Sequence, residues 1–284
     1  LDLSLRKTQR KLASKKSFVW IKRQTTAKET KAIQDRQLPG IDFVSEYSRF
    51  YPNKTLAAQA LGFTGLDGKG LEGIEFYYDP HLQGELSNIK MFKDALVNGF
   101  SAESRQFHHN GGQNLVLTID SNIQFITESA LKAAAKQHSA RSALAIVMQP
   151  RTGAILAIAH YPLFNPNSYL SFDKALWRNR ALTDPFEPGS TMKIFSAAAA
   201  LESGGITPNT IFFCENGAYR IGKNVVHDIR KYGWLSLQQI IKFSSNIGAV
   251  KVSEKVGAKK LYHTFRDFGF GQKTGIDCPG ETPG

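Results

Sequence analysis

The residues best suited to covalent chemistry are a serine and a lysine three positions apart. Ser190 and Lys193 lie in the stretch FEPGSTMK (186–193), which opens an almost entirely apolar segment. Pro188-Gly189 favours a sharp entry and Gly204-Gly205 a stop, so the segment is predicted to be a helix. Its apolar character on nearly all sides predicts a buried helix, and the i, i+3 spacing would place Lys193 beside Ser190.

This spacing indicates a serine nucleophile with a lysine base. A serine hydroxyl is a poor nucleophile until a base removes its proton. A lysine can act as that base when its pKa falls, and burial lowers the pKa because the charged amine loses its water. A structural alternative exists, since S-x-x-K arises by chance and a lysine in a first helical turn can extend its amine to solvent.

A second motif, Ser244-Ser245-Asn246, lies between two predicted helices, 54 positions after Ser190. Ser244 is suited to relay a proton between the lysine and a leaving amine. Asn246 offers both a donor and an acceptor to a substrate amide. Taken alone, the stretch is better explained as an ordinary helix cap.

The two motifs together carry a family resemblance. S-x-x-K followed by S-x-N is the arrangement of the serine enzymes that react with penicillin. The stretches ALTDPFEPGSTMKIFSAAAALESG, SSNIG and FGFGQKTGIDCPGE resemble the transpeptidase domain of class B penicillin-binding proteins, and LTIDSNIQ and PRTGAILAIAHYPLFNPN match its start. RFYPNKTLAAQALGFTGLDGKGLEGIE resembles the region before that domain, especially in the cell-division branch. The resemblance covers most of the chain from about Trp20 onward.

The resemblance implies an α+β fold in two parts. A polar, pedestal-like or dimerisation-type region over residues 1–110 would precede a transpeptidase domain over 111–284, in which helices pack on an antiparallel sheet. The boundary is placed at HHNGGQN (108–114), a linker by composition. The domain is expected to be truncated at its C-terminus.

Hydrophobic patterning predicts the elements around the motifs. LVLTID (115–120) alternates like a strand, and a capping box over 121–124 would open a helix whose apolar face runs along 123–134. The apolar runs SALAIVM and AILAIA, joined by QPRTG, predict a hairpin buried on both faces. A second capping box over 236–239 predicts a short helix that runs into the SSN motif.

Lys273-Thr274-Gly275 spells the third motif of the family, K-T-G, but we expect a loop there. Glycines flank it on one side and a Pro-Gly pair on the other, whereas the functional triplet must lie on a strand that lines the active-site groove. It also follows Ser244 by only 29 residues. The functional triplet is therefore expected beyond Gly284.

The resemblance implies a peptidoglycan D,D-transpeptidase acylated by β-lactams and acting in septal cell-wall synthesis. Ser190 would attack the carbonyl between the two terminal D-alanines of a donor stem peptide, and Lys193 would take its proton. Ser244 would pass the proton to the departing D-alanine, and Asn246 would hold the donor amide. The Ser190 backbone N–H would form half of an oxyanion hole. No metal or cofactor is required.

The implied partners are stem peptides as donor and amino acceptor, β-lactam antibiotics, and other division or wall-synthesis proteins. A single-pass anchor, absent from this chain, would hold the catalytic domain on the periplasmic side of the bacterial cytoplasmic membrane. Three alternatives stay open: an elongation-type class B protein, a β-lactamase or β-lactam sensor, and a non-catalytic division scaffold acting through residues 1–110. The intact S-x-x-K opposes a purely structural role.

Composition and spacing bear on the kinds of partner and site that the protein can have. The net charge of +12 suits an anionic polymer or a membrane surface as well as a plain basic surface. Lysines and arginines are not interleaved with aromatics in a nucleic-acid motif, so that partner is discounted. Cys214 and Cys278 lack the spacing of a zinc site or a disulfide framework, and isolated histidines such as His160 and His227 lack metal-site spacing.

Overall fold

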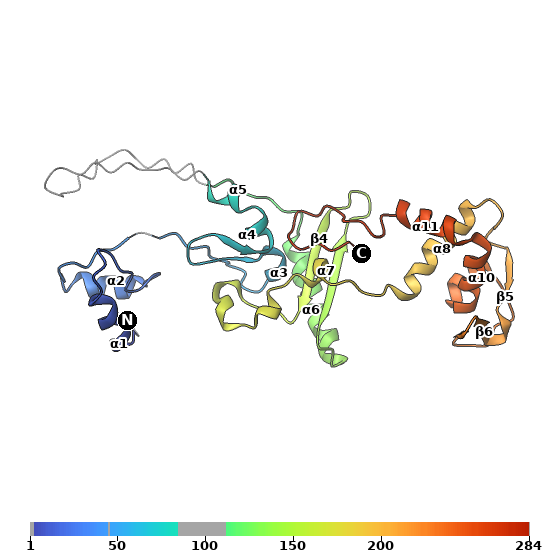
Figure 1. Cartoon of the computed structure of the whole chain (residues 1–284), viewed down its shortest axis with the longest axis horizontal. Helices are drawn as coiled ribbons and strands as arrows, with labels where there is room; N and C mark the ends of the chain where they lie inside the picture. Colours follow the sequence, from blue (N-terminus) through green and yellow to red (C-terminus); the bar gives the residue numbers. More distant parts are fainter. Residues whose placement is uncertain (1–2, 45, 85–111, 284) are drawn as a thin grey trace. The chain divides into compact units, whose positions relative to one another are not determined.

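A computed structural model describes residues 3–44, 46–84 and 112–283, which form two compact units (Figure 1). The first unit holds Leu1–Ala181 with Asp277–Pro279, and the second holds Leu182–Ile276 with Gly280–Gly284. The linker residues predicted at 108–111 lie outside the described residues. The proposed domains 1–110 and 111–284 stay a prediction.

The first unit consists of helices and two small antiparallel hairpins. Its elements are α1 (Leu5–Leu12), α2 (Ala27–Gln34), α3 (Ala58–Leu61), β1 (Phe63–Thr64), β2 (Gly70–Glu72), α4 (Gly73–Tyr77), α5 (Asp79–Gln83), α6 (Ser121–Gln137), β3 (Ala143–Met148), β4 (Ile155–Tyr161), η1 (Pro166–Ser171), η2 (Lys174–Leu176) and, at the boundary, α7 (Arg180–Thr183). Strand β1 pairs with β2, and β3 pairs with β4. Within the described ranges, no helix combines the length and apolar composition that crossing a membrane needs.

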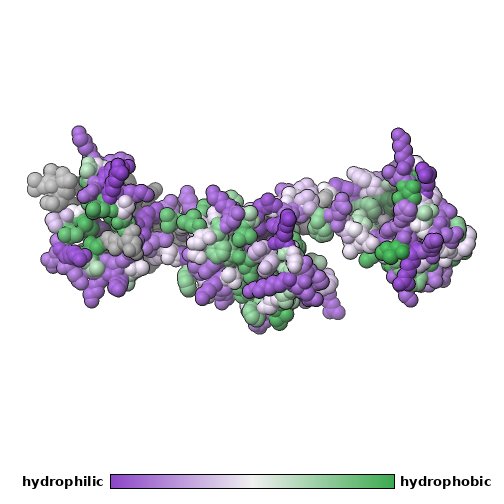
Figure 2. Space-filling view, turned by 90° about the horizontal axis from the view of Figure 1, so that it is seen from below, coloured by the Kyte–Doolittle hydropathy of each residue, from purple (hydrophilic) through white to green (hydrophobic). Residues whose placement is uncertain are grey.

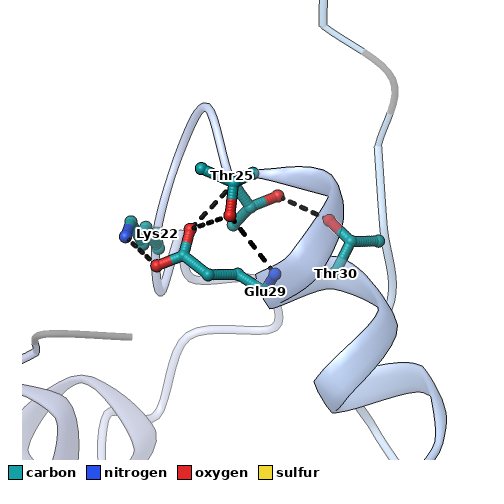
Figure 3. Close-up of polar contacts among 5 residues, drawn as sticks. Lys22, Thr25, Glu29 and Thr30 are labelled. Atoms are coloured by element: carbon teal, nitrogen blue, oxygen red, sulfur yellow. Dashed lines mark hydrogen bonds and ion pairs between the residues drawn. The ribbon is translucent and has the colours of Figure 1, made fainter.

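Helix α2 shows how local chemistry starts an element in the polar N-terminal part. The Thr26 side chain accepts from the Glu29 backbone N–H, and the Glu29 carboxylate accepts from the Thr26 backbone N–H, which is a complete capping box. Figure 3 shows the same carboxylate reaching the Lys22 amine, 2.6 Å away, while Thr25 and Thr30 bond to each other at 3.0 Å. The Lys22 contact, followed by the Thr26 backbone N–H, lowers the pKa of Glu29 to about 2.

The predicted hairpin around QPRTG is confirmed as β3–β4, which is antiparallel and turns through Gly153 at φ +75°. Burial on both faces holds for the middle of β4 but is wrong for β3, whose residues alternate between half-buried and exposed. The strand predicted over 115–120 is also wrong. This segment runs beside β4 through single contacts, such as the Asp120 N–H to the Leu156 carbonyl at 2.9 Å, without forming a ladder.

Helix α6 packs on β3 and β4 (Figure 1), but not through the predicted face or cap. Asp120 is its N-cap and accepts from the backbone N–H groups of residues 122 and 123. Two of its buried side chains are polar: Gln124 donates to Glu128 at 2.7 Å and exchanges hydrogen bonds with the backbone of Ile158. A second donor to Glu128 is the Ala57 N–H at 2.8 Å. Because these partners satisfy the buried polar atoms, the helix can bury an amide and a carboxyl in place of its apolar residues.

The second unit packs its helices and two small antiparallel sheets around one core. Its elements are η3 (Gly189–Thr191), α8 (Met192–Glu202), β5 (Ile211–Phe213), η4 (Glu215–Gly217), β6 (Ala218–Ile221), β7 (Asn224–His227), β8 (Trp234–Ser236), α9 (Leu237–Phe243), α10 (Asn246–Val256) and α11 (Ala258–Asp267). Strand β5 pairs with β8 and β6 with β7, all antiparallel. Side chains of α8, α9, α10, β5 and β8 form its core, including Ala200, Phe212, Leu235, Ile240 and Ile247.

Two expectations for this unit have different outcomes. The capping box over 236–239 is confirmed at the start of α9. The helix predicted after Ser190 exists as α8, but it is buried only along the side that meets α9, α10 and α11. Ala199 and Ala200 are fully buried, while Ile194 is 61% exposed. On the face that Figure 2 presents, hydrophobic and hydrophilic residues are interspersed.

Candidate active site

Ser190 is presented by a tight turn at the entrance to α8. It lies in the single 3-10 turn η3, and the preceding Gly189 has φ +59°, a conformation that a residue with a Cβ rarely adopts. Lys193 is the second residue of α8. The turn and the first helical residues thus place the hydroxyl and the amine on the same side of the helix entrance.

Ser244 and Asn246 come from the turn between α9 and α10. Ser244 ends α9 in the left-handed region, with φ 55° and ψ 40°, which is unusual for a residue other than glycine. Asn246 is the first residue of α10, and Ser245 caps that helix by accepting from the Gly248 N–H at 2.8 Å. A turn this short brings both motif side chains to the same end of the two helices.

The four predicted residues meet at the Lys193 amine. Nζ lies 3.2 Å from Ser190 Oγ, 3.0 Å from Ser244 Oγ, and 2.7 Å from both the Ser244 carbonyl oxygen and Asn246 Oδ1. The Ser244 hydroxyl lies 2.9 Å from Ser190 Oγ. One amine therefore contacts both serine hydroxyls, which also contact each other.

The electrostatic setting of this amine favours a base. Burial lowers the pKa of Lys193, and the negative charge of Asp228 opposes that shift. Hydroxyl oxygens within hydrogen-bond reach allow direct proton transfer between Ser190, Lys193 and Ser244. In the part of the chain that the structure describes, no group of three histidine, cysteine or carboxylate side chains is arranged to hold a metal ion.

Sequence reasoning missed Asp228, which follows strand β7. Its carboxylate accepts hydrogen bonds from the Ser245 hydroxyl at 2.7 Å and from the backbone N–H groups of Asn246 and Ile247. Nearby, Asn246 Nδ2 donates to the His227 carbonyl at 2.9 Å. No sequence spacing links Asp228 to the SSN motif, because a β-hairpin brings the two together.

The K-T-G triplet lies in irregular chain, as predicted. Residues 273–276 belong to no helix or strand. The backbone N–H and the hydroxyl of Thr274 both donate to Glu281 Oε1, so they support a local turn. The contacts that assemble Ser190, Lys193, Ser244 and Asn246 are made without this segment.

A comparison with known families decides what this cluster belongs to. Residues 143–284, half of the chain, match the model of the penicillin binding protein transpeptidase domain. The chain belongs to the penicillin-binding protein transpeptidase family. Residues 4–117 match the penicillin-binding protein dimerisation domain, so the predicted class B resemblance is confirmed in both the N-terminal and the C-terminal part of the chain.

Named relatives agree with this membership. This penicillin-binding protein chain is 35% identical over 272 residues to a probable peptidoglycan D,D-transpeptidase PbpC of Pseudomonas aeruginosa, covering 95% of this chain and 48% of the relative. It is 32% identical over 270 residues to peptidoglycan D,D-transpeptidase FtsI of Escherichia coli K12, covering 94% and 45%. The chain thus spans about half the length of the curated relatives it matches.

Solved structures agree on the fold. Penicillin binding protein 3 of Mycobacterium tuberculosis, in its apo form, matches with a TM-score of 0.69 and 30% identity, covering 83% of this chain and 50% of that one. The same protein has been solved in complex with ampicillin. The predicted α+β class, with helices packed on antiparallel strands, is therefore confirmed for this penicillin-binding protein.

Proposed function

We propose that the protein containing this chain is a peptidoglycan D,D-transpeptidase that works through a serine acyl-enzyme. The observation that carries the proposal is the position of Lys193 Nζ, within 3.2 Å of the Ser190 hydroxyl and 3.0 Å of the Ser244 hydroxyl. A neutral amine placed there can remove the Ser190 proton and supply one through Ser244. The names of the relatives support the same reaction.

Acylation begins when Ser190 Oγ attacks the carbonyl between the two terminal D-alanines of a donor stem peptide. The Ser190 proton moves to Lys193 Nζ, and the Ser190 backbone N–H stabilises the developing oxyanion. The peptide C–N bond then breaks, and the departing D-alanine amine takes a proton from Lys193 through the Ser244 hydroxyl. Asn246 orients the donor amide, for which its Oδ1 and Nδ2 atoms offer an acceptor and a donor.

Deacylation reverses the proton path with a different amine. The amino group of a second stem peptide attacks the acyl-Ser190 carbonyl and gives its proton to the amine of Lys193. The ester C–O bond breaks, and Ser190 Oγ takes that proton back from Lys193. A β-lactam resembles the donor, so it acylates Ser190 and leaves an adduct that acceptor amines do not remove.

The biological setting proposed is septal wall synthesis. The relatives named FtsI support the division branch over the elongation branch, and other division proteins are the expected partners. We place the catalytic domain on the periplasmic side of the cytoplasmic membrane, held by an anchor outside this chain. The functional K-T-G strand is likewise assigned to a part of the protein outside it.

Incubation of the full-length protein with a fluorescent penicillin tests this function. A long-lived adduct on Ser190, absent from the Ser190→Ala variant, is the expected result. Rapid turnover of the penicillin would indicate a β-lactamase, which needs a base that activates water. No adduct at all would leave the non-catalytic scaffold as the better account.

A further inference from the structure

Asp228 collects three hydrogen bonds from the turn that carries Ser244 and Asn246. The Ser245 hydroxyl donates to Oδ2 at 2.7 Å, and the Asn246 and Ile247 N–H groups donate to Oδ1. These N–H groups begin α10, so the carboxylate also faces the positive end of an eleven-residue helix. Because the Ser245 hydroxyl is buried, removing the Asp228 carboxylate would leave it without this hydrogen bond, at a cost in stability.

The hairpin that ends at Asp228 is fixed to α10 by a second set of contacts. Lys251, on α10, forms an ion pair with Glu215 at 3.0 Å, and its Nζ lies 3.6 Å from the centre of the Tyr219 ring. The Tyr219 hydroxyl donates to Glu254, also on α10, at 3.1 Å. Strand β6 carries Tyr219 and pairs with β7, so these contacts hold the end of β7 next to the start of α10.

We propose that Asp228 is a positioning residue: its carboxylate holds the Ser244–Asn246 turn in place and is the negative charge that the Lys193 amine experiences. The first half rests on the three hydrogen bonds. The second rests on the short path through Asn246, whose backbone N–H donates to Asp228 while its Oδ1 accepts from Lys193 Nζ at 2.7 Å. This inference rests on the proposed function, since it gives Lys193 a base's role.

Asp228 is a charged side chain that acts on the Lys193 amine. Within the described residues, the negative charge of Asp228 works against the lowering of the Lys193 pKa by burial. Charged side chains on two neighbouring helices form ion pairs of their own: Lys251 on α10 pairs with Glu215, and Lys260 on α11 pairs with Glu202. The adjacent His227 is exposed and contributes a main-chain carbonyl to Asn246.

The pH profile of acylation separates the effect of the Asp228 charge from the effect of its hydrogen bonds. We would measure the acylation rate of the full-length protein by a fluorescent penicillin, across neutral and alkaline pH, for wild type, Asp228→Asn, Asp228→Ala and the matched control Ser245→Ala. The asparagine keeps a side-chain oxygen for the N–H groups but loses the charge. The serine variant removes a hydrogen bond from the same turn and changes no charge.

Loss of the Asp228 charge should lower the pKa of Lys193 further, so the neutral amine persists to lower pH. We expect the acidic limb of the Asp228→Asn profile to shift to lower pH by about half a pH unit or more. The acidic limb of Ser245→Ala should coincide with that of wild type. Asp228→Ala should acylate at least about tenfold more slowly than wild type, because the turn loses its anchor.

Two results would overturn the inference. One is an Asp228→Asn limb that coincides with wild type, and the other is wild-type acylation by Asp228→Ala. In both cases labelling of wild-type Ser190 would leave the proposed function standing. If wild type itself is not acylated at Ser190, the proposed function and this inference fail together.

Discussion

Four oxygen atoms lie within hydrogen-bond distance of Lys193 Nζ, which is more than the three N–H groups of a protonated amine can reach. A neutral amine has two N–H groups, which can point at the two nearest oxygens, the Ser244 carbonyl and Asn246 Oδ1, both at 2.7 Å. Its lone pair then faces the hydroxyls of Ser190 and Ser244. The uncharged amine is thus fully hydrogen-bonded while it serves as an acceptor, as a general base must.

Ser244 has two separable properties, its hydroxyl and its left-handed backbone. Ser244→Gly removes the hydroxyl but suits φ 55°, so we expect stability to stay the same or rise by up to about 1 kcal/mol. Acylation of the full-length protein by penicillin should fall by about 10- to 1,000-fold, because the proton relay is lost. Wild-type acylation in a folded Ser244→Gly protein would remove Ser244 from the mechanism.

His160 gives a pH prediction away from the site. Burial, and next the nearby Arg180 charge, lower the pKa of His160 to about 4, from an ordinary 6.5. Between these values the unfolded chain binds more protons than the folded one, so stability is lost as pH falls through this window. The thermal midpoint of the protein should therefore drop between neutral pH and pH 4.5 or so, and less steeply in His160→Gln.

His263 provides the matched control for this experiment, since it is exposed on α11. His263→Gln should reproduce the wild-type pH dependence of the thermal midpoint. Equal slopes for wild type and His160→Gln would show that His160 does not contribute to acid sensitivity.

At the scale of elements, the distance between α9 and α10 sets where the SSN turn lies. Gly248 faces α9 so closely that an added Cβ would come within 2.5 Å of Ile240 Cγ1. Gly248→Ala should therefore push the helices apart, destabilise the protein by about 1–3 kcal/mol, and slow acylation. Chemical denaturation and penicillin labelling measure the two effects.

Gly205→Ala is the control for this change, because a Cβ there meets nothing within 4 Å and its backbone is not left-handed. It should leave both stability and acylation close to wild type. If Gly248→Ala behaves in the same way, close approach of α9 and α10 does not position the site.

Elements were predictable from sequence where local signals decide them. The cap at Ser236 and the β3–β4 turn at Gly153 each follow from the chemistry of one residue. The buried face of α6 was not predictable, because Gln124 is satisfied by Ile158, distant in sequence. The prediction that α8 is buried on nearly all sides was wrong for a related reason. Composition does not say which neighbours cover a helix.

At the scale of the whole molecule, motif spacing predicted which side chains meet more reliably than hydrophobic patterns predicted the elements. Ser190 and Lys193 share one helix entrance, so their contact follows from spacing, and the family pattern supplied Ser244 and Asn246. Asp228 was not predicted, because the β6–β7 hairpin, and no sequence spacing, places it next to the start of α10. Family patterns also extend beyond the site, because two domain families match residues 4–117 and 143–284.

The most direct test of the account is peptide mass spectrometry of the full-length protein after brief exposure to penicillin, for wild type, Lys193→Arg and the exposed-lysine control Lys259→Ala. Arginine keeps the positive charge but cannot lose its proton. The account predicts an adduct on Ser190 in wild type and Lys259→Ala, formed at least about 100-fold more slowly in Lys193→Arg. An adduct on another residue, or equal rates in all three proteins, would contradict the claim that Lys193 activates Ser190.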